Sequence, residues 1–143
     1  MPSVLVDTGV WYSFFDDRDR YNDRQTVDAL AEIVQGMTVV IPWPVVYETL
    51  RTRMSRNRLG LLAFELQLKS PNVVFIDDSP YRDDALAECF ESSIRVGRPL
   101  SMTDCLLRAL MLDERIKLEY LATFNDDDFV DVCARRSIHL LPG

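Results

Sequence analysis

Short apolar runs with strand-like composition alternate with segments of helical periodicity along most of the chain. The runs are rich in β-branched residues, and the segments between them place apolar residues three or four positions apart. Alternating strands and helices form parallel sheets that are covered on both faces. The chain is therefore predicted to be an α/β protein with a central parallel sheet of about five strands. The strand-like runs are residues 4–6, 38–41, 73–76, 121–123 and 138–141.

Glycines and prolines mark where several of the predicted helices begin or end. Gly36 and Gly97 stand at helix ends, where glycine favours the backbone of the final turn. Pro42 and Pro44 follow the second strand and are typical of a helix start. The helices are predicted around residues 11–15, 21–35, 45–54, 59–68, 81–96 and 101–116, with a further short helix before the last strand.

The composition is that of one globular domain over residues 1–143. Apolar residues make up 48% of the chain and charged residues 27%, and the length is sufficient for a real core. No apolar run approaches the ~18 residues of a membrane span, and no basic, apolar leader opens the chain. The three cysteines lack C-x-x-C spacing and are interpreted as reduced thiols, which indicates the cytoplasm and no membrane partner.

Acidic residues follow several of the predicted strands. Asp7 ends the first strand, and Glu48 lies within two helical turns of the second. Asp104 opens the strongest predicted helix, and the acidic run 126–128 follows the strand at 121–123. Ligands of open α/β sheets bind outside the carboxyl ends of the strands. Clustered carboxylates repel one another unless a hard cation holds them, so the pattern predicts a Mg²⁺ or Mn²⁺ site for phosphate chemistry.

Each of these acids also has a purely structural explanation. Asp7 could cap the helix that follows it. Asp104 stands three residues after Ser101 and fits a capping box. Glu48 could be an ordinary exposed glutamate, and the acids after Asn125 could be ordinary helix-start residues. The recurrence of acids after several strands is what favours a functional site.

Basic residues are concentrated in one stretch, although the net charge is −7. Such a chain does not coat nucleic acid by bulk attraction. Arginine can nevertheless grip a phosphate through two donors at once. The stretch is predicted either to hold nucleic-acid phosphates beside the acidic site or to form a solvated helix face. Its members, all just after Glu48, are Arg51, Arg53, Arg56 and Arg58.

Several other kinds of site are excluded. His139 is the only histidine and lies in an apolar run, so neither a zinc site nor a Ser-His-Asp triad is expected. No glycine-rich nucleotide-binding loop occurs. A phosphoacceptor domain needs a lysine near the last strands, but the only lysines are Lys69 and Lys117. A dehalogenase-type phosphatase needs Asp-x-Asp after the first strand, whereas the chain has Gly9 at the second acidic position.

Four short motifs occur in order along the chain: 4–11 (VLVDTGVW), 44–48 (PVVYE), 100–106 (LSMTDCL) and 121–129 (LATFNDDDF). Together they resemble the PIN domain, and within that family the VapC-type toxins of bacterial toxin–antitoxin pairs. The resemblance spans the whole chain. Each motif is short, so the specificity of the resemblance comes from the order, spacing and number of the four.

The resemblance implies a PIN-like single domain with the activity of a Mg²⁺- or Mn²⁺-dependent endoribonuclease. Asp7, Glu48 and Asp104 would hold one or two cations, and the arginine stretch would hold the RNA substrate. A cognate antitoxin would insert a basic or apolar segment into the same cleft. Family members are commonly homodimers, and the apolar helices around residues 45–68 are the predicted contact surface.

The fourth motif departs from the family pattern, which usually has Asp where this chain has Asn125. Either three carboxylates suffice, or Asp126 or Asp128 takes the fourth catalytic position. Asp126 is preferred because it lies one residue beyond the usual position. Two alternatives stay open: a PIN-like nucleic-acid-binding module without catalysis, and a housekeeping RNA-processing nuclease.

Overall fold

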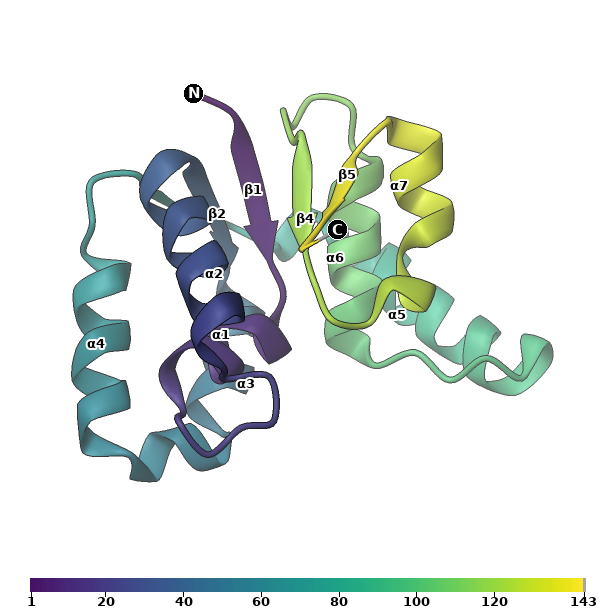
Figure 1. Cartoon of the computed structure of the whole chain (residues 1–143). Coiled ribbons are helices and arrows are strands. Elements are labelled where there is room, and N and C mark those ends of the chain that lie inside the picture. The colour runs from purple at the N-terminus through teal and green to yellow at the C-terminus, as the bar shows by residue number, and fades with distance from the viewer. Residues whose placement is uncertain (143) are drawn as a thin grey trace.

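Five parallel strands form the central sheet of the protein (Figure 1). The computed structural model describes residues 1–142. The strand order is β3-β2-β1-β4-β5, and every neighbouring pair is parallel. The predicted α/β class and five-stranded parallel sheet are confirmed. The strands are β1 (Ser3–Val6), β2 (Thr38–Pro42), β3 (Val73–Ile76), β4 (Tyr120–Ala122) and β5 (His139–Leu141).

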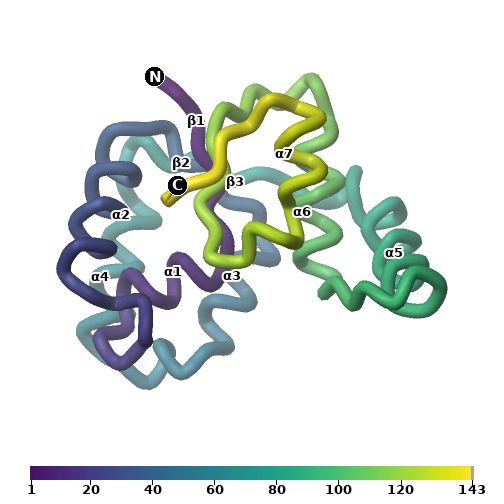
Figure 2. The backbone as a smooth tube through the Cα atoms, turned by 45° about the vertical axis from the view of Figure 1, so that its right-hand side comes forward, coloured from purple at the N-terminus to yellow at the C-terminus, as the bar shows by residue number. Residues whose placement is uncertain are grey.

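Helices cover both faces of the sheet, with α1 to α4 on one side and α5 to α7 on the other (Figures 1 and 2). The division follows from the strand order, because right-handed crossovers lead outward from β1 to β3 and then back to β4 and β5. The α-helices are α1 (Thr8–Phe15), α2 (Arg24–Gly36), α3 (Trp43–Leu50), α4 (Arg58–Leu68), α5 (Arg82–Phe90), α6 (Met102–Leu112) and α7 (Val130–Arg136). The shorter helical turns are η1 (Arg53–Arg56), η2 (Ser79–Tyr81), η3 (Glu91–Val96) and η4 (Asp126–Asp128).

The core is built around the three inner strands, β2, β1 and β4, most of whose side chains are buried on both faces. Val4 and Ile41 are fully buried, which agrees with a parallel sheet that has helices on each side. Trp11 of α1 packs against Phe64 of α4, with ring centroids 5.7 Å apart. This packing fixes the end of β1 and the start of α1, and so the position of Asp7 between them. Within residues 1–142, no helix is both long and apolar enough to cross a membrane.

Three predicted helices differ from the structure at their carboxyl ends. The helix predicted for 45–54 stops at Leu50, before the short turn η1. The helix predicted for 81–96 is α5 followed by the π-helical turn η3, and Gly97 closes it with a left-handed backbone (φ 74°). The helix predicted for 101–116 stops at the end of α6. There Asp113 accepts hydrogen bonds at 3.0 Å from both the backbone N–H and the guanidinium of Arg115. Such local bonds offer the backbone an alternative to the helix.

Candidate active site

Asp7 lies at the carboxyl end of β1 and caps α1. Its Oδ1 accepts a hydrogen bond from the Thr8 backbone N–H at 2.8 Å. Its Oδ2 accepts one from the hydroxyl of Thr123, which follows the neighbouring strand β4, at 2.9 Å. The side chain is also deeply buried, since Asp7 is only 5% exposed. The capping role is real, but capping alone does not require burial of a carboxylate.

The surroundings of Asp7 oppose its ionisation. Burial and the negative charges of Asp104 and Glu48 raise the pKa of Asp7 to about 6. The hydrogen bonds from Thr123 and Thr8 act in the opposite direction and do not offset this effect. A buried carboxylate that is crowded by other carboxylates gains stability when a cation binds beside it. Asp7 is therefore the centre of the candidate site.

Asp104 takes part both in a helix cap and in the acidic cluster. The Ser101 hydroxyl accepts a hydrogen bond from the Asp104 backbone N–H at 3.0 Å, as expected for the N-cap of α6. The pKa of Asp104 is raised, mainly by burial and also by the charges of Asp128 and Glu48. The structural explanation and the functional one are thus compatible, because the capped first turn is a rigid mount for the carboxylate.

Glu48 lies in the second turn of α3, which begins directly after β2 with Pro44 in its first turn. The glutamate is half-buried and lines a shallow groove that also contains Thr103 of α6. Three acids that lie far apart in the sequence, Asp7, Glu48 and Asp104, are therefore close enough for their charges to interact.

The acidic run after β4 forms η4. The charge of Asp128 acts on Asp104, whereas that of Asp126 acts on Cys133 of α7. Asp126 is exposed and Asp128 is half-buried. Asp126 is the sequence-based choice for the fourth position and stays a prediction. Asp128 is the other candidate, because it is half-buried and its charge acts on Asp104.

Asn125, which departs from the family pattern, contributes its backbone. Its N–H donates to the Thr123 hydroxyl oxygen at 3.0 Å, and the same hydroxyl donates to Asp7. Asn125 itself is exposed. This chain of hydrogen bonds orients the Asp7 carboxylate through the loop that follows β4.

Arg108, one helical turn after Asp104, is a residue of this region that sequence analysis missed. It is only 7% exposed, and its guanidinium makes two bonds to the Asp131 carboxylate, at 2.7 and 2.8 Å. It also donates to Glu88 at 2.7 Å and to the backbone carbonyl of Asp128 at 2.8 Å. This pairing lowers the pKa of Asp131 to about 2. Arg108 therefore fastens η4 to α5, α6 and α7.

The oxygen donors of this region suit a hard cation such as Mg²⁺ or Mn²⁺ better than zinc. Within residues 1–142, no three acidic, histidine or cysteine side chains are already arranged as a metal-binding group. The carboxylates are thus close enough to repel one another but would have to draw together around an ion. The hydroxyl of Thr8, next to Asp7, is buried without a hydrogen-bond partner. Buried polar groups are normally paired, so this hydroxyl fits a site that holds a water or ligand oxygen.

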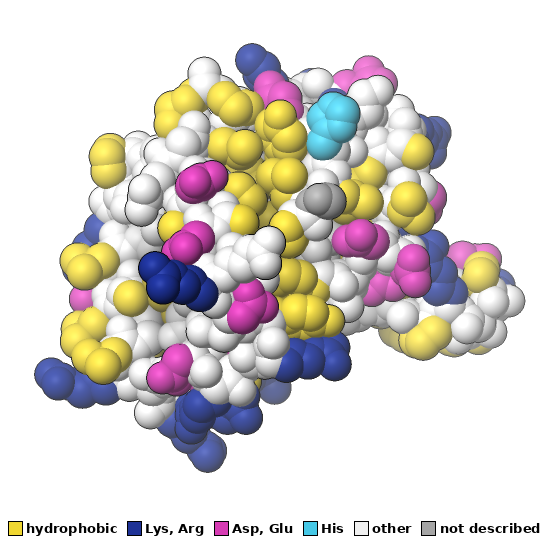
Figure 3. Space-filling model, in the orientation of Figure 1, with side chains coloured by type: hydrophobic (Ala, Val, Ile, Leu, Met, Phe, Trp, Pro, Cys, Tyr) yellow, Lys and Arg dark blue, Asp and Glu magenta, His cyan; other side chains and the backbone are white. Residues whose placement is uncertain are grey.

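The four predicted RNA-binding arginines do not share one helix face, because α3 ends earlier than predicted. Arg51 is the C-cap of α3, Arg53 and Arg56 lie in η1, and Arg58 opens α4. All four are exposed. Figure 3 shows basic side chains gathered along the lower edge of the molecule.

Only one of these arginines lies in the groove beside an acid of the cluster. Arg51 lines that groove together with Glu48. Arg53 has a structural partner instead, since its Nε lies 3.4 Å from the carboxylate of Asp16, which is fully buried and also pairs with Arg18 at 3.2 Å. Arg53 thus anchors the end of α1, and the RNA contacts of all four arginines stay predictions, with Arg51 the one that lies beside Glu48.

Comparisons with known proteins agree with this description. The crystal structure of VapBC2 from Rickettsia felis, bound to a DNA fragment from their promoter, contains a chain of similar fold with a TM-score of 0.60. The two chains share 15% sequence identity, and the similarity covers 96% of each. A comparison with curated protein sequences gave no match. The PIN domain family model matches residues 4–135, which is most of the chain. The chain belongs to the PIN domain family.

Proposed function

We propose that this PIN domain is a metal-dependent endoribonuclease. PIN domains are nucleases. The finer assignment is supported by four carboxylates whose charges act within one region: those of Asp104 and Glu48 act on Asp7, and those of Asp128 and Glu48 act on Asp104. Oxygen-only clusters of this kind suit Mg²⁺ or Mn²⁺ and the cleavage of phosphodiester bonds. The four residues are Asp7, Glu48, Asp104 and Asp128.

Each residue of the site has a task that its surroundings support. A bound divalent ion would neutralise charge on the scissile phosphate and make the attacking water more acidic. Asp7, Glu48 and Asp104 would hold that ion, and Asp128 adds negative charge beside Asp104. The Thr123 hydroxyl fixes one oxygen of Asp7. The unpartnered Thr8 hydroxyl would hold a water next to it.

The choice between the two acids of η4 gives a first prediction. Asp128→Ala is expected to weaken Mn²⁺ binding by roughly tenfold or more, because it removes charge that acts on Asp104. Asp126→Ala is the matched control and is expected to change the affinity by less than about twofold, since Asp126 is exposed. Calorimetric titration of Mn²⁺ into both variants, with cleavage rates of a single-stranded RNA, makes the comparison. A larger loss in Asp126→Ala would support our sequence-based choice. Equal affinity in both would leave a site of three carboxylates.

A second prediction concerns the arginines. Arg51→Gln is expected to weaken binding to RNA of any sequence and to reduce the slope of log affinity against log salt by about 0.7 for a single strand. Arg53→Gln serves as the control, because its guanidinium is already paired with Asp16. Fluorescence anisotropy at several salt concentrations measures both slopes. Arg56 and Arg58 stay predicted RNA contacts. If Arg51→Gln keeps the wild-type slope, Arg51 is a solvated residue that does not contact phosphate.

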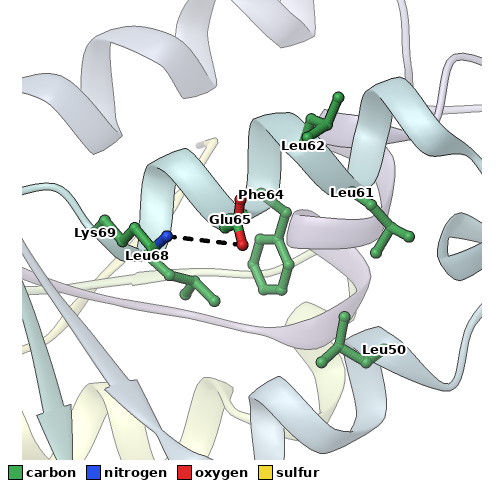
Figure 4. A pocket seen from close by; sticks show the side chains of 7 residues that line it. All are labelled: Leu50, Leu61, Leu62, Phe64, Glu65, Leu68 and Lys69. Carbon is green, nitrogen blue, oxygen red and sulfur yellow. Dashed lines mark ion pairs between the residues drawn. The ribbon is translucent and has the colours of Figure 1, made fainter.

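We also propose that the protein is the cytoplasmic toxin of a type II toxin–antitoxin pair. The fold shared with a chain of the VapBC2 complex supports this. An apolar groove of about 430 Å³ along α4 would accept an apolar segment of a cognate antitoxin (Figure 4). It shares no lining residue with the groove beside Glu48, so docking along α4 would be separate from insertion into the acidic cleft, which stays the sequence-based prediction. The groove is lined by Leu50, Leu61, Leu62, Phe64, Glu65, Leu68 and Lys69.

Expression in a bacterial host distinguishes this role from a housekeeping nuclease and from a non-catalytic module. A toxin arrests growth, and the arrest disappears with Asp7→Asn. A housekeeping nuclease is tolerated at the same level, although it cleaves RNA in vitro. A binding module shows no cleavage with any divalent ion. Growth arrest that persists with Asp7→Asn would contradict a nuclease toxin.

A homodimer is the remaining part of the proposal. The predicted surface at 45–68 does expose apolar side chains, Leu59 and Leu66 among them. A second apolar surface is formed by side chains of α5 and η3, which extend away from the sheet in Figure 1. Because we propose the α4 groove for the antitoxin, we propose the α5–η3 surface as a second candidate contact, and the surface at 45–68 stays the sequence-based prediction. The exposed apolar residues of the α5–η3 surface are Leu86, Phe90, Ile94 and Val96.

A further inference from the structure

A shallow groove of about 300 Å³ lies between α3 and the start of α6, directly beside Glu48. One wall carries Tyr47 and the other Met102, which are 65% and 38% exposed. A second hollow shares part of this lining and continues the groove toward the end of β3. The first groove is lined by Pro44, Tyr47, Glu48, Arg51, Met102 and Thr103, and the second adds Asp78, Arg82 and Leu106.

Tyr47 has no evident task in holding the fold together. Its neighbours on α3, Val45 and Val46, are buried in the core, whereas most of the Tyr47 side chain stays in solvent. Arg51 lies four residues further along the chain, on the same side of the helix. The ring and the guanidinium therefore flank the groove, with Glu48 between them in the sequence.

An exposed aromatic ring next to a basic side chain is the combination that single-stranded nucleic acids require. Bases stack on aromatic rings whatever their sequence, because every base has a flat face, and cationic side chains follow the phosphates. A base inside a duplex is already stacked on both faces and cannot use such a ring. The groove thus has the components to accept a strand whose base has left the stack, immediately beside the carboxylates of the cluster.

We propose that Tyr47 is the stacking platform for an unpaired base of the nucleotide next to the scissile phosphate, with Arg51 holding a neighbouring phosphate. The inference rests on the proposed nuclease function and deepens it, because it makes Tyr47 the residue that binds an unpaired base. Removing the ring should therefore weaken binding of single strands and leave the chemical step unchanged.

Steady-state kinetics on two substrates test the platform: a fluorescein-labelled unstructured RNA of twelve nucleotides and a hairpin with a fully paired stem. Tyr47→Ala is expected to raise KM for the unstructured RNA by about 5- to 150-fold, which is the range expected for the loss of one stacked base. The value of kcat should stay within about twofold of that of the wild type. Tyr47→Phe keeps the flat ring and should restore the wild-type KM. Leu66→Ala, which trims a 69% exposed side chain on α4, is the control for loss of exposed apolar area.

Anisotropy of the labelled RNA and sedimentation velocity separate the possible failures. An unchanged KM and affinity in Tyr47→Ala, or failure of Tyr47→Phe to rescue, would overturn the platform. A dimer that dissociates in Tyr47→Ala would also overturn it and assign this face to a second copy of the chain. Wild-type protein that binds the RNA through Tyr47 but never cleaves it would support the platform and refute the nuclease function.

Discussion

Replacing Asp7 by Asn is expected to abolish metal-dependent RNA cleavage and to make the metal-free protein more stable at pH 8. The Asp7 carboxyl group has a pKa of about 6 in the folded protein and an ordinary value of 3.8. The folded state therefore binds the proton more tightly than the unfolded state does. Stability falls as the pH rises from about 4 to 6 and stays lower above that range, by up to about 3 kcal/mol. An asparagine removes the charge, and with it this loss.

Urea unfolding in EDTA at pH 5 and pH 8 measures the effect. Wild-type protein should lose stability between the two pH values, and Asp7→Asn should lose less. Asp126→Asn is the matched control, because Asp126 is an exposed acid in the same region and should leave the difference unchanged. If Asp7→Asn is the less stable protein at pH 8, the hydrogen bonds to Thr8 and Thr123 outweigh the buried charge.

Replacing Arg108 by Met is expected to lower the free energy of unfolding by roughly 2 to 3 kcal/mol. The substitution leaves Asp131, Glu88 and the Asp128 carbonyl without their shared donor. Truncating one partner of a fully buried pair has a larger effect, but half of the Asp131 side chain is open to water. The turn η4 should also loosen, and Mn²⁺ affinity should fall together with stability.

Arg115→Met provides the comparison for Arg108→Met. Arg115 makes the same kind of pair with Asp113, but its side chain is 86% exposed, so the expected loss is below about 1 kcal/mol. Urea midpoints at pH 7 rank the two variants. Equal and small losses would mean that the Arg108 network does not fasten η4.

The fold and three residues of the candidate site were predictable because they depend on local patterns. All five predicted strands agree with the observed ones to within one residue at each end, and Asp7 directly follows the first of them. Glu48 lies in the first two turns of α3, whose start is predicted by Pro42 and Pro44. Asp104 lies in the first turn of α6, whose start is predicted by Ser101. Since parallel strands all end at one edge of a sheet, helix starts near that edge bring the acids together.

The remaining features depend on contacts that no local pattern contains. The exposure of Asp126 and the partial burial of Asp128 depend on the way Phe129 enters the core and ends the turn. Arg53 pairs with Asp16, 37 residues earlier in the chain, so its structural role was hidden within a run of similar arginines. The partners of Arg108 lie on two other helices that only the tertiary fold brings to α6.

The central claim is that the carboxylates around Asp7 form a divalent metal site for RNA cleavage. Its most direct test compares wild-type protein and Asp7→Asn on an unstructured, end-labelled RNA at pH 8, in EDTA and after Mn²⁺ is added back. We predict that the wild-type protein cleaves only with Mn²⁺ and that Asp7→Asn is slower by at least roughly 100-fold. Equal cleavage by the two proteins, or wild-type cleavage that persists in EDTA, would contradict the claim.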